Sequence, residues 1–67
     1  MNVFVNDKET EVKINSTINS ILKDLKLSDN KGIAIAVNNH VIKKDDWDDY
    51  ILNENDKVLI IRASMGG

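Results

Sequence analysis

Apolar residues recur at every second position from Met1 to Val5, which is the pattern of a β-strand with one face turned inward. The same alternation returns over residues 9–14, after a polar turn. Two alternating segments joined by a short polar turn are typical of a β-hairpin. The pattern therefore predicts a hairpin over residues 1–14, with a charged outer face that suits the edge of a sheet.

The spacing of the apolar residues then changes from two to 3.6, the period of an α-helix. One helical stripe accounts for four of them, Ile18, Ile21, Leu22 and Leu25. Asn15 or Ser16 is expected to be the N-cap, and the polar residues 28–32 end the helix, with Gly32 free to adopt a positive φ. A stripe of about ten residues is too short to be stable alone, so the helix is expected to pack across the sheet.

An unbroken apolar run over residues 33–37 predicts an interior strand. If its odd-numbered residues face the helix, Ala34 and Ala36 lie on the opposite face of the sheet, where their small side chains project only a short distance. The asparagine pair that follows tolerates left-handed backbone angles. This pair is therefore expected to turn the chain into a further short strand at residues 41–42.

Trp47 and Tyr50 lie three residues apart within an acidic stretch, residues 44–52. The spacing predicts a short helical turn capped by Asp45, in which Trp47 is half-buried. The stretch lacks the spaced glycine and the terminal glutamate of a calcium-binding loop, so its aspartates are interpreted as a solvated face. His40, the only histidine, is expected to be exposed in a turn.

The end of the chain is unusual. Six β-prone residues, 58–63, predict a last strand. Over the following residues, 64–67, the side chains become smaller, and the sequence ends in two glycines. Glycines have no Cβ atom and can lie flat in a channel that would reject any side chain. Their terminal carboxylate is ionised at neutral pH and is a poor electrophile, so it needs activation, for which an ATP-dependent partner could form an acyl-adenylate. The pattern predicts a folded domain over residues 1–63 and a flexible tail over residues 64–67.

Composition narrows the class of function. The 67 residues make one small domain, and the absence of cysteine excludes a disulfide framework, a thiolate metal site and a cysteine nucleophile. A net charge of -2 with scattered lysines argues against nucleic-acid binding, and no apolar run is long enough for a membrane span. Because the N-terminus lacks a secretion signal, we expect a cytoplasmic chain whose partners are proteins.

The first and last predicted strands are both rich in apolar residues, which a solvated edge would leave exposed. Placing them side by side at the centre of the sheet, parallel and connected through the helix, buries both and keeps the usual handedness of a crossover. The predicted fold is therefore α+β, of the β-grasp or ubiquitin-like type. It has a mixed sheet of four to five strands, with one main helix packed on one face.

Five segments carry a resemblance to a known family: Val3-Phe4-Val5-Asn6, Gly32 to Asn38, Val41-Ile42 followed by Trp47, Asn55 to Val58, and Gly66-Gly67. Together they resemble the ThiS family, the sulfur carriers of thiamine biosynthesis, over nearly the whole chain. Family members often show Asn-Gly at the first turn and Gly-Asp before the last strand, where this chain has Asn6-Asp7 and Asn55-Asp56. Asparagine adopts left-handed angles nearly as readily as glycine, so we interpret both as neutral exchanges within turns.

The resemblance implies a chemistry and its partners. In ThiS proteins an adenylating enzyme related to ubiquitin-activating enzymes consumes ATP to convert the terminal carboxylate to an acyl-adenylate. Sulfur drawn from cysteine by a desulfurase, or from another donor, then replaces AMP, and thiazole synthase receives the resulting thiocarboxylate. By this resemblance Gly67 carries the sulfur, while Ser64, Met65 and Gly66 form the flexible arm. The carrier is expected to bind no cofactor and to act as a co-substrate rather than an enzyme, since it has no nucleophile and base pair of its own.

Strand parity predicts where a partner docks. If the even-numbered residues of the last strand face the helix, Leu59 and Ile61 emerge on the open face of the sheet beside Phe4. Such an apolar patch next to the tail is expected to bind a partner, with scattered surface hydrophobic residues as the alternative. Arg62, at the root of the tail, is expected either to pair with an acidic residue of the partner or to be simply solvated.

Other functions are compatible with a β-grasp domain that ends in a diglycine. The small subunit of molybdopterin synthase shares both features, although those chains are usually longer. A ubiquitin-like modifier would pass the same adenylate to a lysine of another protein. From a different class, a plain β-grasp interaction module would use no tail chemistry at all.

Overall fold

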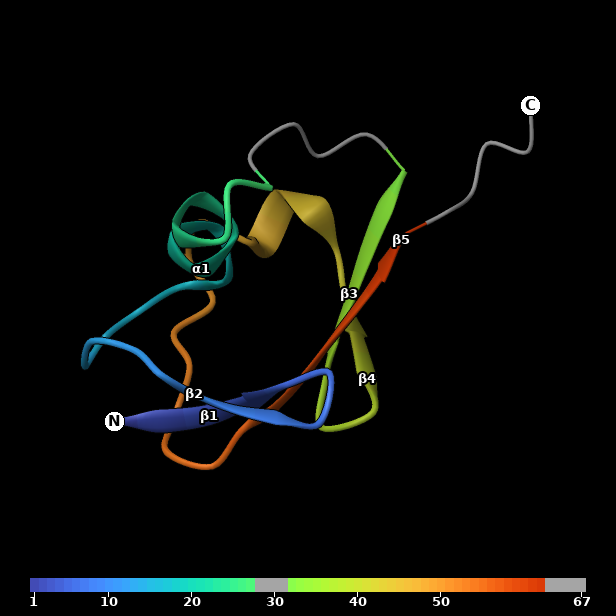
Figure 1. Ribbon diagram of the computed structural model, residues 1–67. Helices are drawn as coiled ribbons and strands as arrows, with labels where there is room; N and C mark the ends of the chain where they lie inside the picture. Colours follow the sequence, from blue (N-terminus) through green and yellow to red (C-terminus); the bar gives the residue numbers. More distant parts are fainter. Residues whose placement is uncertain (28–31, 63–67) are drawn as a thin grey trace.

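A computed structural model describes residues 1–27 and 32–62 of the chain (Figure 1). The elements follow in the order β1 (Asn2–Val5), β2 (Lys8–Glu11), α1 (Ile18–Asp24), β3 (Ile33–Val37), β4 (His40–Ile42), a 3-10 helix (Lys44–Asp46) and β5 (Lys57–Arg62). Within these residues no helix is long and apolar enough to cross a membrane.

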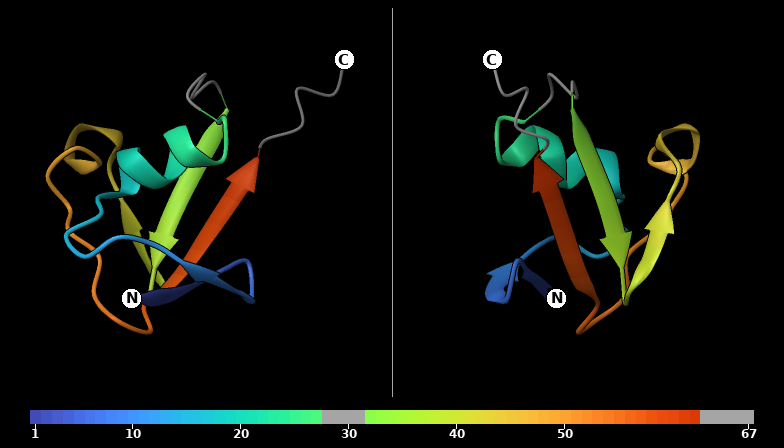
Figure 2. Two further views of the ribbon diagram at one scale, coloured as in Figure 1. Left: turned by 60° about the vertical axis from the view of Figure 1, so that its left-hand side comes forward. Right: turned by 90° about the vertical axis from the view of Figure 1, so that its right-hand side faces the viewer.

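The five strands form one mixed sheet in the order β2-β1-β5-β3-β4. Strand β5 is the central strand; it runs parallel to β1 and antiparallel to β3. The hairpins β1–β2 and β3–β4 flank it on either side, and α1 lies across one face of the sheet (Figure 2). The predicted β-grasp architecture is confirmed, including the parallel pairing of the first and last strands in the interior of the sheet.

Asparagine and aspartate take the place of glycine in the tight turns. Positive φ angles occur at Asn6 (50°) and Asp7 (68°) between β1 and β2, and at Asn38 (51°) and Asn39 (71°) between β3 and β4. Two consecutive residues with positive φ are typical of the type I′ turn, whose twist matches that of paired strands. Gly32 also has a positive φ, of 70°, as predicted.

The core lies between α1 and the sheet. It consists of residues that are almost fully buried: Val3, Ile18, Ile21, Leu22, Ile35, Val37, Trp47, Leu52 and Val58. The expectation that Trp47 is half-buried is wrong, because its side chain is only 2% exposed. The indole can be buried at low cost because its Nε1–H donates a hydrogen bond to the carbonyl of Ile42 at 2.9 Å.

The predicted N-caps of both helices are wrong. Thr17, not Asn15 or Ser16, caps α1, and it forms a capping box in which the Thr17 and Ser20 hydroxyls each accept the other residue's backbone N–H. Ser16 is engaged elsewhere, because its hydroxyl donates to Lys13 and its carbonyl accepts from Leu52.

The 3-10 helix has Lys43 at its N-cap position, without a side-chain hydrogen bond, and Asp45 lies inside the helix.

The first helix is shorter than the stripe of about ten residues predicted from the sequence. Helix α1 ends at Asp24, and Leu25, expected in the apolar stripe, is the C-cap residue and is 41% exposed.

Asp56 fixes the turn that leads into β5. It is buried, and its carboxylate accepts hydrogen bonds from the backbone N–H of Asn53 at 2.8 Å and from Nδ2 of Asn38 at 3.0 Å. Oδ1 of Asn38 in turn accepts the N–H of Lys57, the first residue of β5, at 3.0 Å. The start of the central strand is therefore tied to the β3–β4 turn.

Replacing Asp56 by alanine should remove both hydrogen bonds and leave their donors without a partner. We expect the free energy of unfolding, measured by urea denaturation, to fall by about 1–3 kcal/mol. Asp49→Ala serves as the matched control, because Asp49 is exposed. Equal losses in the two variants would show that the Asp56 contacts do not stabilise the fold.

Candidate functional site

The face of the sheet opposite α1 carries a continuous group of apolar side chains. The register places Leu59 opposite Ala36, Ile61 opposite Ala34, and Ala36 opposite Val41. Phe4 pairs with Lys57 and therefore shares the face of Leu59. We call this group the open-face patch; it consists of Phe4, Ala34, Ala36, Val41, Leu59 and Ile61.

Exposure differs among the residues of the open-face patch. Leu59 is 47% exposed, Ile61 48% and Val41 76%, whereas Ala36, between Leu59 and Val41, is 7% exposed. The small alanine forms a low floor, and the larger residues on either side of it stand above that floor. The odd-numbered residues of β3 and the even-numbered residues of β5 turn the other way, toward α1, as predicted from the alternation.

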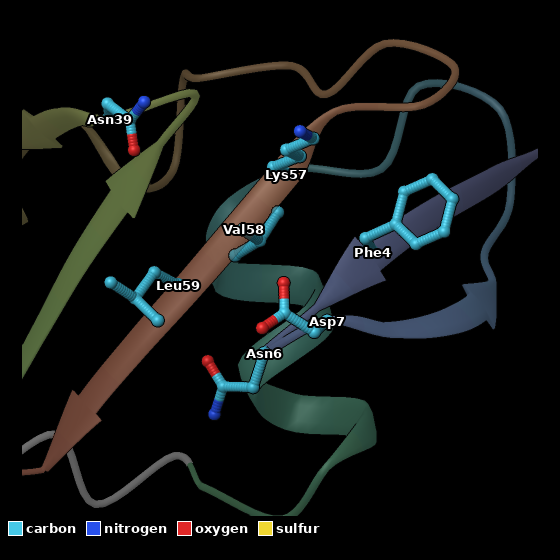
Figure 3. Close-up of a pocket in the computed structure, with 7 residues that line it drawn as sticks. All are labelled: Phe4, Asn6, Asp7, Asn39, Lys57, Val58 and Leu59. Carbon is cyan, nitrogen blue, oxygen red and sulfur yellow. The ribbon is translucent and has the colours of Figure 1, made fainter.

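A hollow of about 230 Å³ lies on the open face, where β1 approaches β5 (Figure 3). Its lining comes from β1, from both tight turns and from the start of β5: Phe4, Asn6, Asp7, Asn39, Lys57, Val58 and Leu59. Sites for small-molecule ligands usually measure about 300–1,000 Å³, so this hollow is small for such a ligand. The exposed charged residues Asp7 and Lys57 are part of its lining.

The predicted partner-binding residues fall on both sides of β5. Phe4, Leu59 and Ile61 come together on the open face. Arg62 pairs with Ile33 and is exposed, but it follows Ile61 in the strand, so its side chain starts from the opposite face. Arg62 therefore lies at the tail root but is not part of the open-face patch.

The remaining predicted site residues, Ser64, Met65, Gly66 and Gly67, lie outside the described residues, as does Ala63 at the predicted end of the last strand. The described part of β5 begins at Lys57 and ends at Arg62, so the strand starts one residue before the prediction. Its direction carries the chain away from the β1–β2 hairpin toward residues 63–67 (Figures 1 and 2).

Sequence analysis missed Val41 and the charged rim of the hollow. The signal for Val41 was present, because a two-residue turn at Asn38 and Asn39 fixes the hairpin register and places Val41 opposite Ala36. Lys57 and Asp7 had no comparable signal. They meet at the hollow only because β1 and β5, far apart in the sequence, lie next to each other.

Within residues 1–27 and 32–62 no three histidine, aspartate or glutamate side chains are grouped so that they could hold a metal ion. The open-face patch itself is apolar, and polar residues lie at its margins. One margin is formed by Glu9, which pairs with Phe4 and accepts a hydrogen bond from Nδ2 of Asn2 at 2.8 Å.

Comparison with known proteins decides the family. The model of the ThiS family matches residues 2–67, which includes the terminal diglycine. This chain belongs to the ThiS family. The resemblance found in its motifs is thereby confirmed over almost the entire length.

Individual relatives agree with the family assignment. The chain is 24% identical to the sulfur carrier protein ThiS of Escherichia coli K12, over the full length of both chains. It is also similar to the crystal structure of the thiamine biosynthesis protein ThiS from Geobacter metallireducens, with a TM-score of 0.85, 23% identity and full coverage of both chains. A solution structure of a thiamine biosynthesis protein from the same organism matches with a TM-score of 0.77 and 23% identity, covering all of this chain and 88% of the other. These two structures support the fold of this ThiS-family chain.

Stability should depend little on the open-face patch. Ile35 is 1% exposed and Ile61 is 48% exposed, so the same isoleucine-to-alanine change can be compared on the two faces of the sheet. We expect Ile35→Ala to lower the free energy of unfolding by about 2–5 kcal/mol and Ile61→Ala by about 1 kcal/mol or less, measured by urea denaturation. A cost for Ile61→Ala equal to that for Ile35→Ala would mean that the patch serves the fold rather than a partner.

Proposed function

We propose that this chain is a sulfur carrier of thiamine biosynthesis whose terminal glycine holds the sulfur. The family match through the diglycine is the observation that carries the proposal. The Escherichia coli relative, which is named a sulfur carrier and matches over its full length, supports it. In this function the chain is a co-substrate of other enzymes and not a catalyst.

The proposed chemistry begins with activation of the Gly67 carboxylate. In a partner enzyme a carboxylate oxygen attacks the α-phosphorus of ATP, and pyrophosphate leaves. The resulting acyl-adenylate has AMP as a good leaving group. A sulfur nucleophile at the oxidation level of sulfide then attacks the acyl carbon and displaces AMP, which leaves a thiocarboxylate. The chain has no cysteine, so this sulfur comes from an external donor. A cysteine desulfurase is suited to this role together with a thiol reductant, which supplies the two electrons that bring persulfide sulfur to the oxidation level of sulfide.

The two ends of the reaction define the partners. An adenylating enzyme related to ubiquitin-activating enzymes supplies the ATP-dependent step, and thiazole synthase accepts the sulfur. The arm formed by Ser64, Met65 and Gly66 presents Gly67 to both. Two glycines at the end suit a narrow active-site channel, because they have no side chain to exclude.

Docking of these partners uses the open-face patch. Leu59 and Ile61 lie on the strand that leads into the tail, so a partner covering them is next to the arm. Half-exposed apolar residues grouped beside a reactive end are typical of a binding surface. Phe4 extends this surface to the start of β5, and Arg62 is available for a charged contact at the tail root.

The sulfur-carrier chemistry can be tested by intact-mass analysis after incubation with the adenylating partner, ATP and a sulfur donor. We expect the mass to increase by the difference between a sulfur and an oxygen atom, because one carboxylate oxygen is replaced. A chain lacking Gly67 should show no increase. Conjugates with lysines of other proteins would instead indicate a modifier, and an unchanged mass of the full chain would contradict the proposal.

Docking on the open-face patch can be tested with Leu59→Glu. The new carboxylate would be placed in an apolar interface, so we expect the dissociation constant for the adenylating partner, measured by calorimetry, to rise at least about tenfold. Ile14→Glu is the control, because Ile14 is also exposed but lies outside the sheet. Unchanged affinity of Leu59→Glu, with a folded circular dichroism spectrum, would exclude the patch as the docking surface.

A further inference from the structure

The side chain of Asn6 contacts β5 at a point where β1 has already ended. The ladder between the two strands ends at Val5 and Val58. The chain then reverses at Asn6, whose backbone N–H still donates to the carbonyl of Val58 at 2.9 Å. Beyond this bond, the Ile60 N–H donates to Oδ1 of Asn6 at 2.8 Å, and Nδ2 of Asn6 donates to the Ile60 carbonyl at 3.4 Å.

These contacts make the carboxamide of Asn6 a substitute for one peptide group. A carboxamide offers the same N–H donor and C=O acceptor as the backbone. Asn6 therefore satisfies both backbone groups of Ile60 that face β1, which two backbone groups of β1 would have done if the strand had continued. We call this pair of hydrogen bonds the Asn6 clamp.

The far end of β5 is held differently on its two sides. Its pairing with β3 continues to Arg62, which lies opposite Ile33. On the β1 side, Asn6 is the partner closest to the tail that the described residues provide. Past the ends of β1 and β4 the sheet narrows to two strands, because Ile61 and Arg62 of β5 are paired only with β3. Narrow ribbons twist more strongly than wide sheets, so the Asn6 clamp limits how far the end of β5 can rotate.

We propose that Asn6 is a positioning residue for the reaction at Gly67. The inference rests on the proposed function, in which the open-face patch docks and the tail delivers the carboxylate. Ile60 lies between Leu59 and Ile61, so the Asn6 clamp fixes the exit direction of the chain relative to the docked patch. Small errors in the placement of a reacting group can reduce rates by about a hundredfold. Asn6 itself does not touch the reacting atoms.

The decisive variant is Asn6→Gly, which keeps the positive φ of the turn and removes the carboxamide. Asn15→Gly is the matched control, because Asn15 is an exposed asparagine with a φ of 69° whose side chain makes no hydrogen bond within residues 1–27 and 32–62. Asn6→Asp is a second variant, which keeps an acceptor for the Ile60 N–H and places an anion beside the Ile60 carbonyl. Thermal unfolding confirms that each variant is folded before it is used.

Two measurements separate a positioning role from a merely structural one. In Asn6→Gly we expect hydrogen exchange of the Ile60 amide, followed by NMR, to accelerate about tenfold, because a hydrogen bond worth roughly 1 kcal/mol or slightly more is lost. In ATP–pyrophosphate exchange with the adenylating partner, kcat should fall about tenfold while KM for the carrier changes less than about twofold, because docking is retained and correct placement is not. Asn6→Asp should be intermediate, and Asn15→Gly should match the unmodified chain in both measurements.

Each other outcome has a defined meaning. An unchanged Ile60 exchange rate in Asn6→Gly would show that the clamp does not hold β5, and faster exchange with an unchanged kcat would show that it is structural only. A rise in KM with constant kcat would place Asn6 in the docking surface, which also overturns the positioning role. If the unmodified chain supports no adenylation, the proposed function fails and the reaction role of Asn6 with it, whereas the exchange measurement still reports whether the clamp exists.

Discussion

The structure depends on the parallel pairing of β1 with β5. This contact joins the two ends of the sequence and places β5 at the centre of the sheet, between two hairpins that do not pair with each other. Buried residues of both strands, Val3 and Val58, then face the helix and close the core. Strand β5 is held by β1 on one side and by β3 on the other, and its pairing with β3 continues to Arg62. The chain that follows Arg62 therefore starts from a strand anchored in the interior of the sheet.

The same strand divides its residues between the core and the open face. Val58 is buried against the helix, whereas Leu59 and Ile61 are about half exposed on the other face. One short strand can contribute to both surfaces because successive side chains point to opposite sides. On the open face, Leu59 and Ile61 lie opposite the small Ala36 and Ala34 of the neighbouring strand. A ThiS-family domain of this size thus combines a complete core with an apolar outer face.

Much of this architecture could be predicted from the sequence because the information is local. Alternation over residues 1–14 and 33–37 identified the strands and their faces, and the positions of the asparagines identified the tight turns. Two kinds of feature could not be predicted. One is the choice among adjacent residues of similar chemistry, and the other is a contact between residues far apart in the sequence. Asn15, Ser16 and Thr17 can each cap a helix, and only the fold shows that Ser16 is committed to Lys13 and Leu52.

The same reasoning applies to Trp47 and to the functional surface. The burial of Trp47 requires the carbonyl of Ile42 at the right distance, which no local pattern reveals. The Asn6 clamp likewise joins residues 6 and 60, so the sequence showed an asparagine suited to a turn but not its second role. Val41 was accessible in principle from the hairpin register. The sequence pattern thus predicts which face of the sheet a residue lies on. The partners that an individual side chain contacts are known only from the three-dimensional structure.

The central position of β5 also has a consequence for biogenesis. Strand β5 follows both hairpins in the chain, so the two hairpins have no common neighbour until translation has passed residue 62. Prematurely terminated chains lack the middle of their sheet and are substrates for proteases, as unfolded chains generally are. Quality control of this kind therefore selects for chains in which β5 has joined the two hairpins.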